Sequence, residues 1–203
     1  MPQRYIDTTL FDLFKVGPGP SSSHTIGPMK AGHHFAETCA ALPRDLLVRA
    51  VRFRVRLYGS LSATGTGHGT DAAVVAGLLG TAPESCPAGL LQELMDDPHT
   101  RRKRSLGDGQ VSVCVDDVSH DAIIHDFSYS NTLVADLLDA EDNVLHSQEY
   151  YSVGGGFIQW KGWEPPSLGK PVHRYSNMTE LRAIVKEKGL NIYEIILDNE
   201  MAI

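Results

Sequence analysis

The sequence predicts an α+β domain in which helices pack on a mostly antiparallel sheet. Over residues 49–58 apolar side chains alternate with arginines, which is the pattern of a half-buried strand. The turn residues 140–143 separate two extended stretches, 132–139 and 144–153, and so indicate a hairpin. Two further segments are rich in small residues, and we expect them to be helices that pack closely on a flat surface.

Helices and loops alternate in the first half of the chain. A short helix is predicted at residues 10–14, and the Gly-Pro run at 17–20 ends it. The hydroxyl-rich stretch 21–28 is predicted to be a loop. It leads into the first small-residue helix, which we expect at residues 29–42.

The middle of the chain is predicted to contain a second loop, a second small-residue helix and a linker region. The loop covers residues 61–70, and the helix follows at residues 72–79. Residues 81–109 form the linker region, in which a short helix is expected at residues 90–95. The dense basic run at 101–104 is interpreted as a solvated loop rather than a binding patch.

Strands are predicted to recur in the second half of the chain. Beside the hairpin, extended patterns occur at residues 110–116, 121–129 and 157–160. The three glycines at 154–156 permit backbone geometry that other residues avoid.

After a Pro-rich linker the character of the sequence changes. One helix is expected from Thr179 to a closing Gly189, and Asn191 caps another. Two short helices cannot bury their own apolar faces. We therefore expect the chain to be truncated or to be one of two subunits.

Composition excludes several classes of protein. Of the 203 residues, 42% are hydrophobic and 21% charged, a balance typical of globular proteins. The net charge of −7 argues against general nucleic-acid binding, which needs a basic surface. The three cysteines form no C-x-x-C pair, and the sequence shows no secretory signal and no apolar run near the roughly 20 residues that span a membrane. We expect a soluble cytoplasmic protein with no nucleic-acid or membrane partner.

Residues 21–25 combine four hydroxyls and one imidazole directly before a predicted helix. Unpaired backbone N–H groups at a helix start, at the positive end of the helix dipole, can hold a carboxylate or a phosphate. The alternative is a simple capping cluster, since serine and threonine are common before helices.

Residues 65–71 place His68 between glycines. The glycines let the backbone approach a ligand, and an imidazole can take or give a proton near neutral pH. The alternative is a turn whose histidine caps the next helix. Asp71 can orient the ring or cap the helix, and we favour the cap. A phosphate-binding P-loop is excluded because no lysine follows the glycines.

Three sequence blocks occur together and in a fixed order. They are KVGPGPSSSHTIGPM at residues 15–29, YGSL with GHGTD at residues 58–61 and 67–71, and YYSVGGGF at residues 150–157. This combination closely resembles the iron–sulfur-dependent bacterial L-serine dehydratases, and the likeness covers residues 8–160. The tail from about residue 176 resembles the start of that family's larger catalytic domain.

The resemblance implies a domain organisation. Residues 1–163 would be the β domain, which in the family is similar to the allosteric substrate-binding domain of D-3-phosphoglycerate dehydrogenase. Residues 164–175 would be a linker, and residues 176–203 the start of the α domain. The family's [4Fe-4S] cluster is bound by cysteines of the α domain, not by residues of this chain. The expected partners are L-serine, the α domain or α subunit, and further copies of the enzyme in a homo-oligomer.

The implied reaction removes water from L-serine and gives pyruvate and ammonia, with an open iron of the cluster acting as Lewis acid. The resemblance assigns the catalytic base to His68, and no metal ligand is expected in this chain. The expected substrate-binding residues are Ser21, Ser22, Ser23, His24, Thr25, Gly67, Gly69, Thr70, Asp71 and Asn131. The family usually has His-Pro-Asn where this chain has Tyr129-Ser130-Asn131, so only the asparagine is carried over. The isolated chain is expected to be inactive and to bind no cluster.

A second class of function uses the same loops without catalysis. A regulatory module would bind a small carboxylate, such as serine or a phosphorylated hydroxy acid, and control an attached enzyme. In either case both loops must meet on one small ligand. We therefore expect them at the same end of the sheet.

Overall fold

The computed structural model describes residues 14–164 and 169–203, so the helix predicted at residues 10–14 lies almost entirely outside the described residues. The chain divides into two compact units. One is Lys15–Trp163, and the other contains residues 169–203.

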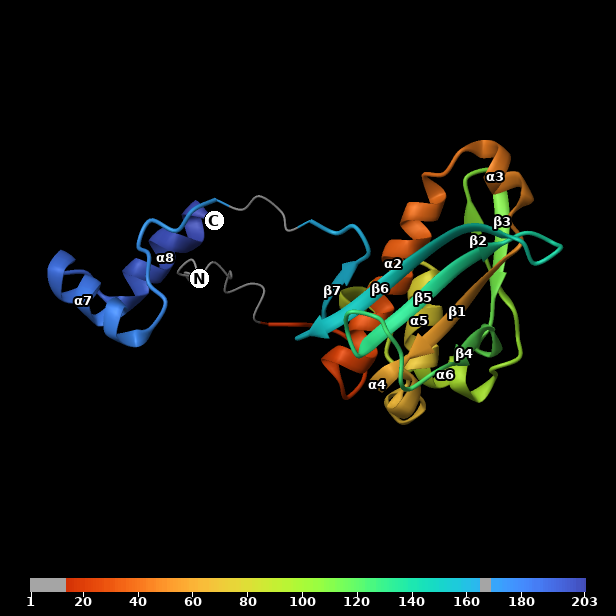
Figure 1. The fold of residues 1–203 in the computed structure, drawn as a ribbon, viewed down its shortest axis with the longest axis horizontal. Coiled ribbons are helices and arrows are strands. Elements are labelled where there is room, and N and C mark those ends of the chain that lie inside the picture. The colour runs from red at the N-terminus through yellow and green to blue at the C-terminus, as the bar shows by residue number, and fades with distance from the viewer. Residues whose placement is uncertain (1–13, 165–168) are drawn as a thin grey trace. The chain divides into compact units, whose positions relative to one another are not determined.

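A seven-stranded sheet forms the centre of the larger unit, as far as the chain is described (Figure 1). From one edge to the other, the strands lie in the order β2 (Arg102–Leu106), β3 (Gly109–Val113), β1 (Arg52–Tyr58), β5 (Asn131–Leu138), β6 (Val144–Gly154) and β7 (Phe157–Trp160). The short strand β4 (Val118–His120) lies outside this order and pairs with β1. β1 runs parallel to β3 and β4, whereas the other pairs are antiparallel. The prediction of an α+β fold with a mostly antiparallel sheet is confirmed.

Two helices, α2 (Gly27–Ala40) and α5 (Thr70–Leu78), pack closely side by side on one face of the sheet (Figure 1). Glycines allow this approach. A Cβ atom at Gly32 would lie 2.4 Å from the carbonyl oxygen of Val74, and one at Gly77 would lie 2.1 Å from that of Met29. Both helices occur where small residues predicted them.

The two faces of the sheet differ as the alternation in β1 predicts. Phe53 and Val55 are fully buried beneath the helices. On the opposite face Arg54 and Arg56 both contact the carboxylate of Asp136, at 2.7 and 3.1 Å. Asp136 is itself fully buried, because the arginine side chains cover it.

Shorter helical segments connect these elements. They are α3 (Arg44–Arg49), α4 (Gly59–Thr64), α6 (Leu90–Asp96), a π-helical turn at Ser22–Ile26, and 3₁₀ turns at Thr66–His68, Pro83–Ser85 and Val115–Asp117. The helix predicted at residues 90–95 is confirmed. The loops predicted at residues 21–28 and 61–70 are wrong in detail, since both are largely helical. Leu61, which is fully buried, anchors α4 in the core despite the many glycine, serine and threonine residues around it.

Two predictions in the middle of the chain are wrong. The basic run at 101–104 is not a solvated loop but enters β2, where tertiary ion pairs hold it; Arg104, for example, contacts Glu37 at 2.5 Å. Residues 121–129 do not form a strand. β1 is already paired with β3 and β4 on one side and with β5 on the other, so no edge of it is left for them. Ile124 is accordingly 93% exposed.

The smaller unit contains α7 (Met178–Lys188) and α8 (Ile192–Ala202). Asn177 caps α7 through its side chain and Gly189 ends it in a left-handed conformation, with φ of 65°. Buried Asn199 holds both backbone groups of His173, accepting from its N–H and donating to its carbonyl. The predicted helix pair is confirmed. Among the described residues, no helix combines the length and apolar character needed to cross a bilayer.

Candidate functional site

Two reciprocal hydrogen bonds tie the predicted loops together. The hydroxyl of Thr25 donates to the carbonyl oxygen of His68 at 2.9 Å, and that of Thr70 donates to the carbonyl oxygen of His24 at 2.5 Å. Both threonines are fully buried. The expectation that the two loops meet at one place is therefore confirmed.

The ring of His68 has a defined orientation. Its Nδ1 lies 2.8 Å from the carbonyl oxygen of Thr64. Because a carbonyl can only accept, Nδ1 carries the hydrogen, and Nε2 of the neutral ring presents a lone pair. Gly67 and Gly69 have open space where a side chain would begin, and Gly69 adopts a φ of 67° that favours glycine. The surroundings leave this nitrogen accessible as a proton acceptor.

His24 lies beside His68, with 5.0 Å between the ring centroids. Its two ring nitrogens are each 3.0 Å from a serine hydroxyl, Nδ1 from Ser23 and Nε2 from Ser60. Burial lowers the pKa of His24, and the neighbouring charge of His68 lowers it further. Near neutral pH the ring is therefore an uncharged hydrogen-bonding group rather than a cation.

The serine-rich segment is a π-helical turn that Ser21 caps, because its hydroxyl accepts from the backbone N–H of His24 at 3.2 Å. Ser22 and Ser23 form the first turn. The hydroxyl of Ser152 donates to the carbonyl of Ser23 at 2.7 Å and thereby joins the third sequence block to the other two. A Cβ atom at Gly27 would lie 2.3 Å from the Ser152 hydroxyl oxygen, so this contact requires glycine.

A hollow of about 520 Å³ adjoins the His68 turn. Residues 16–20 and 67–69 form part of its wall, and Cys86 and Met95 line it further along. Its volume lies within the range that small-molecule pockets occupy.

Asp71 does not behave as predicted. It lies in the first turn of α5, but that helix has no side-chain cap, so the favoured capping role is wrong. Its carboxylate contacts His120, with Oδ1 at 3.0 Å from Nε2. Burial raises the pKa of Asp71, and the charge of His120 opposes that rise.

The sequence reasoning missed His120, Ser60 and Thr64. The partner of His120, Asp71, lies 49 positions away in the chain, so no local pattern joins the two. One local signal in the sequence points to His120. The stretch Val118, Ser119, His120 alternates apolar and polar residues as a short strand does, and the histidine stands at its end. Ser60 and Thr64 lie among several other serine and threonine residues, so their residue type does not mark them as part of the site.

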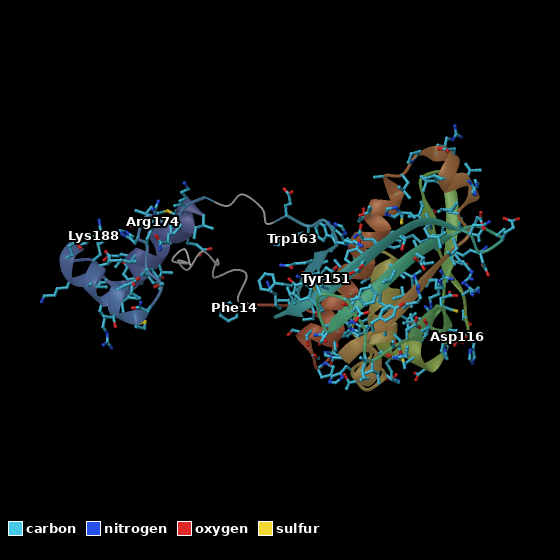
Figure 2. All side chains as sticks on the ribbon, viewed as in Figure 1. Phe14, Asp116, Tyr151, Trp163, Arg174 and Lys188 are labelled. Carbon is cyan, nitrogen blue, oxygen red and sulfur yellow. The ribbon has the colours of Figure 1, made fainter. Side chains whose placement is uncertain are left out.

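Asn131 begins β5 and forms a β-bridge with Gly59, next to Ser60. It therefore lies at the same end of the sheet as the two loops. Tyr129, two residues before Asn131, donates its hydroxyl to Gln159 at 3.0 Å. Its ring is 4.7 Å from that of Tyr151, which is labelled on the sheet in Figure 2.

Comparison with known proteins decides the family. The serine dehydratase beta chain family matches residues 9–163. This chain belongs to that family. It is 36% identical to L-serine dehydratase 2 of Escherichia coli (strain K12), over 96% of this chain and 43% of that protein. It is also 37% identical to an L-serine dehydratase of Streptomyces coelicolor and 33% identical to one of Haemophilus influenzae, in each case over 96% of this chain and 44% of the relative.

The chain thus spans less than half the length of these L-serine dehydratases. Its cysteines do not fit an iron–sulfur cluster. Cys39 lies on α2, Cys86 follows a 3₁₀ turn, and Cys114 precedes another. Burial raises the pKa of Cys39 to about 12 and also raises that of Cys114, whereas a cluster ligand must be a thiolate. Among the described residues no three histidine, cysteine or acidic side chains are grouped to hold a metal ion.

Proposed function

We propose that this chain is the β part of an L-serine dehydratase, a lyase that removes water from L-serine to give pyruvate and ammonia. The observation that carries the proposal is the accessible Nε2 of His68, held in its proton-accepting tautomer by Thr64. The membership of the chain in the serine dehydratase beta chain family supports the choice of substrate.

In this proposal Nε2 of His68 takes the Cα proton of serine. The electron pair of the Cα–H bond forms the double bond to Cβ as the bond from Cβ to the hydroxyl oxygen breaks. The resulting aminoacrylate rearranges to an imine, which water hydrolyses to pyruvate and ammonia. A positioned general base contributes about 10²–10⁴-fold to such a rate.

The hydroxyls of Ser21, Ser22 and Ser23 and the uncharged ring of His24 are proposed to hold the substrate carboxylate. Gly67 and Gly69 leave the room that this approach needs. Asn131 is proposed as a further contact, because it lies at the same end of the sheet.

Thr25 and Thr70 have a different task in the proposal. Their hydroxyls are buried and already donate to the loop carbonyls. They therefore position His24 and His68 relative to each other. Asp71 is likewise engaged, by His120.

Departure of hydroxide needs assistance that these residues do not supply. We propose that the [4Fe-4S] cluster implied by the family resemblance is held by another part of the enzyme, the α domain, which the longer relatives have room to contain. On this view residues 1–163 are the β domain, residues 164–175 the linker and residues 176–203 the beginning of the α domain. The enzyme is proposed to be a cytoplasmic homo-oligomer, and the 203-residue chain alone is proposed to be inactive.

The proposal is tested by assaying the enzyme that contains this chain together with its α part. After anaerobic reconstitution with iron and sulfide, L-serine should give equimolar pyruvate and ammonia. Serine binding without any pyruvate, in a preparation with an intact cluster, would refute the dehydratase and favour a regulatory module. Pyruvate formation by the 203-residue chain alone would refute the proposed division of labour.

A further inference from the structure

His120 ends the short strand β4 and is paired in register with Leu57 of β1. Leu57 is fully buried under the helices, so the ring of His120 projects from the helix-covered face of the sheet. There its Nδ1 lies 3.0 Å from the carbonyl oxygen of Ser62, and its Nε2 lies 3.0 Å from Oδ1 of Asp71 and 3.4 Å from the hydroxyl of Thr66.

These distances require a proton between His120 and Asp71. The carbonyl of Ser62 only accepts, so Nδ1 carries a hydrogen, and a neutral ring would then offer only a lone pair at Nε2. A carboxylate oxygen also offers only lone pairs. Two such atoms at 3.0 Å repel each other unless one of them is protonated, so the contact holds the ring and the carboxylate together when a proton lies on one of the two atoms.

Asp71 needs this partner. It is only 6% exposed, and its Oδ1 receives no well-aligned hydrogen bond from the described residues. A buried carboxylate without a compensating partner is costly. Nε2 of His120, 3.0 Å from Oδ1, is the polar group that meets this need.

The contacts of His120 bracket the turn that carries the proposed base. Ser62, Thr66 and Asp71 lie before and after the carbonyl of Thr64 that orients His68. We propose that His120 is a positioning residue: its contacts with Ser62, Thr66 and Asp71 fix the segment from Ser62 to Asp71 and so hold His68 in its proton-accepting orientation. The catalytic part of this inference rests on the proposed function, whereas the positioning itself does not.

The positioning is tested on the 203-residue chain without any activity. Nitrogen NMR of ¹⁵N-histidine reports the tautomer of each ring. In the wild type His68 should show one tautomer, with the hydrogen on Nδ1. His120→Gln and Asp71→Asn should each convert it to a mixture, whereas the matched control His99→Gln breaks only the exposed pair with Asp116 and should change nothing at His68. A single unchanged tautomer in both variants, with the fold retained, would overturn the inference.

The catalytic consequence is tested in the whole enzyme. His120→Gln should lower kcat about 10- to 100-fold, the loss typical of a small misplacement of a catalytic group. Because His120 acts through His68, the double variant with His68→Ala should be no slower than His68→Ala alone. Independent, multiplying losses would overturn the positioning role. A wild-type enzyme without dehydratase activity would refute the proposed function, and the NMR result would still decide the inference.

Discussion

The two threonine hydroxyls that join the loops should make a measurable contribution to stability. Thr25→Val and Thr70→Val each remove a buried donor and leave a part-buried carbonyl, of His68 or His24, without its partner. Leaving one such group unsatisfied costs about 1–3 kcal/mol, so each variant should lower the free energy of unfolding by that amount. Both threonines are fully buried, which argues against replacement of the lost donor by water.

The two losses should not add. Once either bond is broken, the loops can separate and water can reach the other carbonyl. The double variant should therefore lose at least about 0.5 kcal/mol less than the sum of the two single losses.

Urea unfolding followed by far-ultraviolet circular dichroism measures these values, with an unchanged m-value as the check that the unfolded state is the same. Thr64→Val is the matched control, since its exposed hydroxyl bonds only to the preceding helical turn, at Ser60. Its loss should stay within about 0.5 kcal/mol, as is usual for exposed sites. Single losses below that value for both Thr25→Val and Thr70→Val, or strict additivity, would refute the coupling of the loops.

Three further outcomes follow from the packing and charges. Asp136→Asn should lower the free energy of unfolding by about 3 kcal/mol, the low end for breaking a buried ion pair, because its arginine partners are one-third exposed. Asp108→Asn breaks an exposed ion pair and should lower the free energy of unfolding by less than about 1 kcal/mol. Equal losses for the two variants in urea melts would contradict this expectation. Gly77→Ala should lower the free energy of unfolding by about 1–3 kcal/mol because the added Cβ would clash with the backbone of α2, whereas Gly67→Ala should leave it nearly unchanged in the same melts. A larger loss for Gly67→Ala than for Gly77→Ala would exclude the close approach of the two helices. Burial lowers the pKa of His146 below 6.5, so the unfolded chain binds more protons than the folded one, and the free energy of unfolding should fall as the pH drops below about 6.5. In urea melts at several pH values, the free energy of unfolding of His146→Gln should fall less steeply with decreasing pH. An unchanged pH dependence in this variant would rule out His146 as a cause of the fall.

The parts of the fold that depend on local patterns could be predicted from the sequence. The alternation of apolar residues and arginines in β1 and the small-residue runs of α2 and α5 predict those elements because burial on one face imposes the pattern. β2 was missed for the opposite reason. Its basic residues form a strand because they pair with β3, and acids such as Glu37 and Glu93, which meet them only in the folded chain, balance their charge.

The candidate site shows the same limit. The hydroxyl-rich and glycine-rich loops carry recognisable motifs, so His24 and His68 could be identified as candidates from sequence. Their mutual arrangement could not, since it depends on side-chain contacts between residues more than 40 positions apart. His120 reaches Asp71 only through the register of β4 on β1, which no local pattern encodes.

The role of His68 as the base is tested most directly by steady-state kinetics of His68→Ala and His24→Ala in the reconstituted enzyme, with His99→Ala as an exposed control. His68→Ala should lower kcat by about 10²–10⁴-fold with the cluster spectrum unchanged, because it removes the proton acceptor. His24→Ala should act mainly by raising KM, because its ring is assigned to the substrate carboxylate. A near-normal kcat for His68→Ala together with loss of turnover in His24→Ala would contradict the account and exchange the two roles.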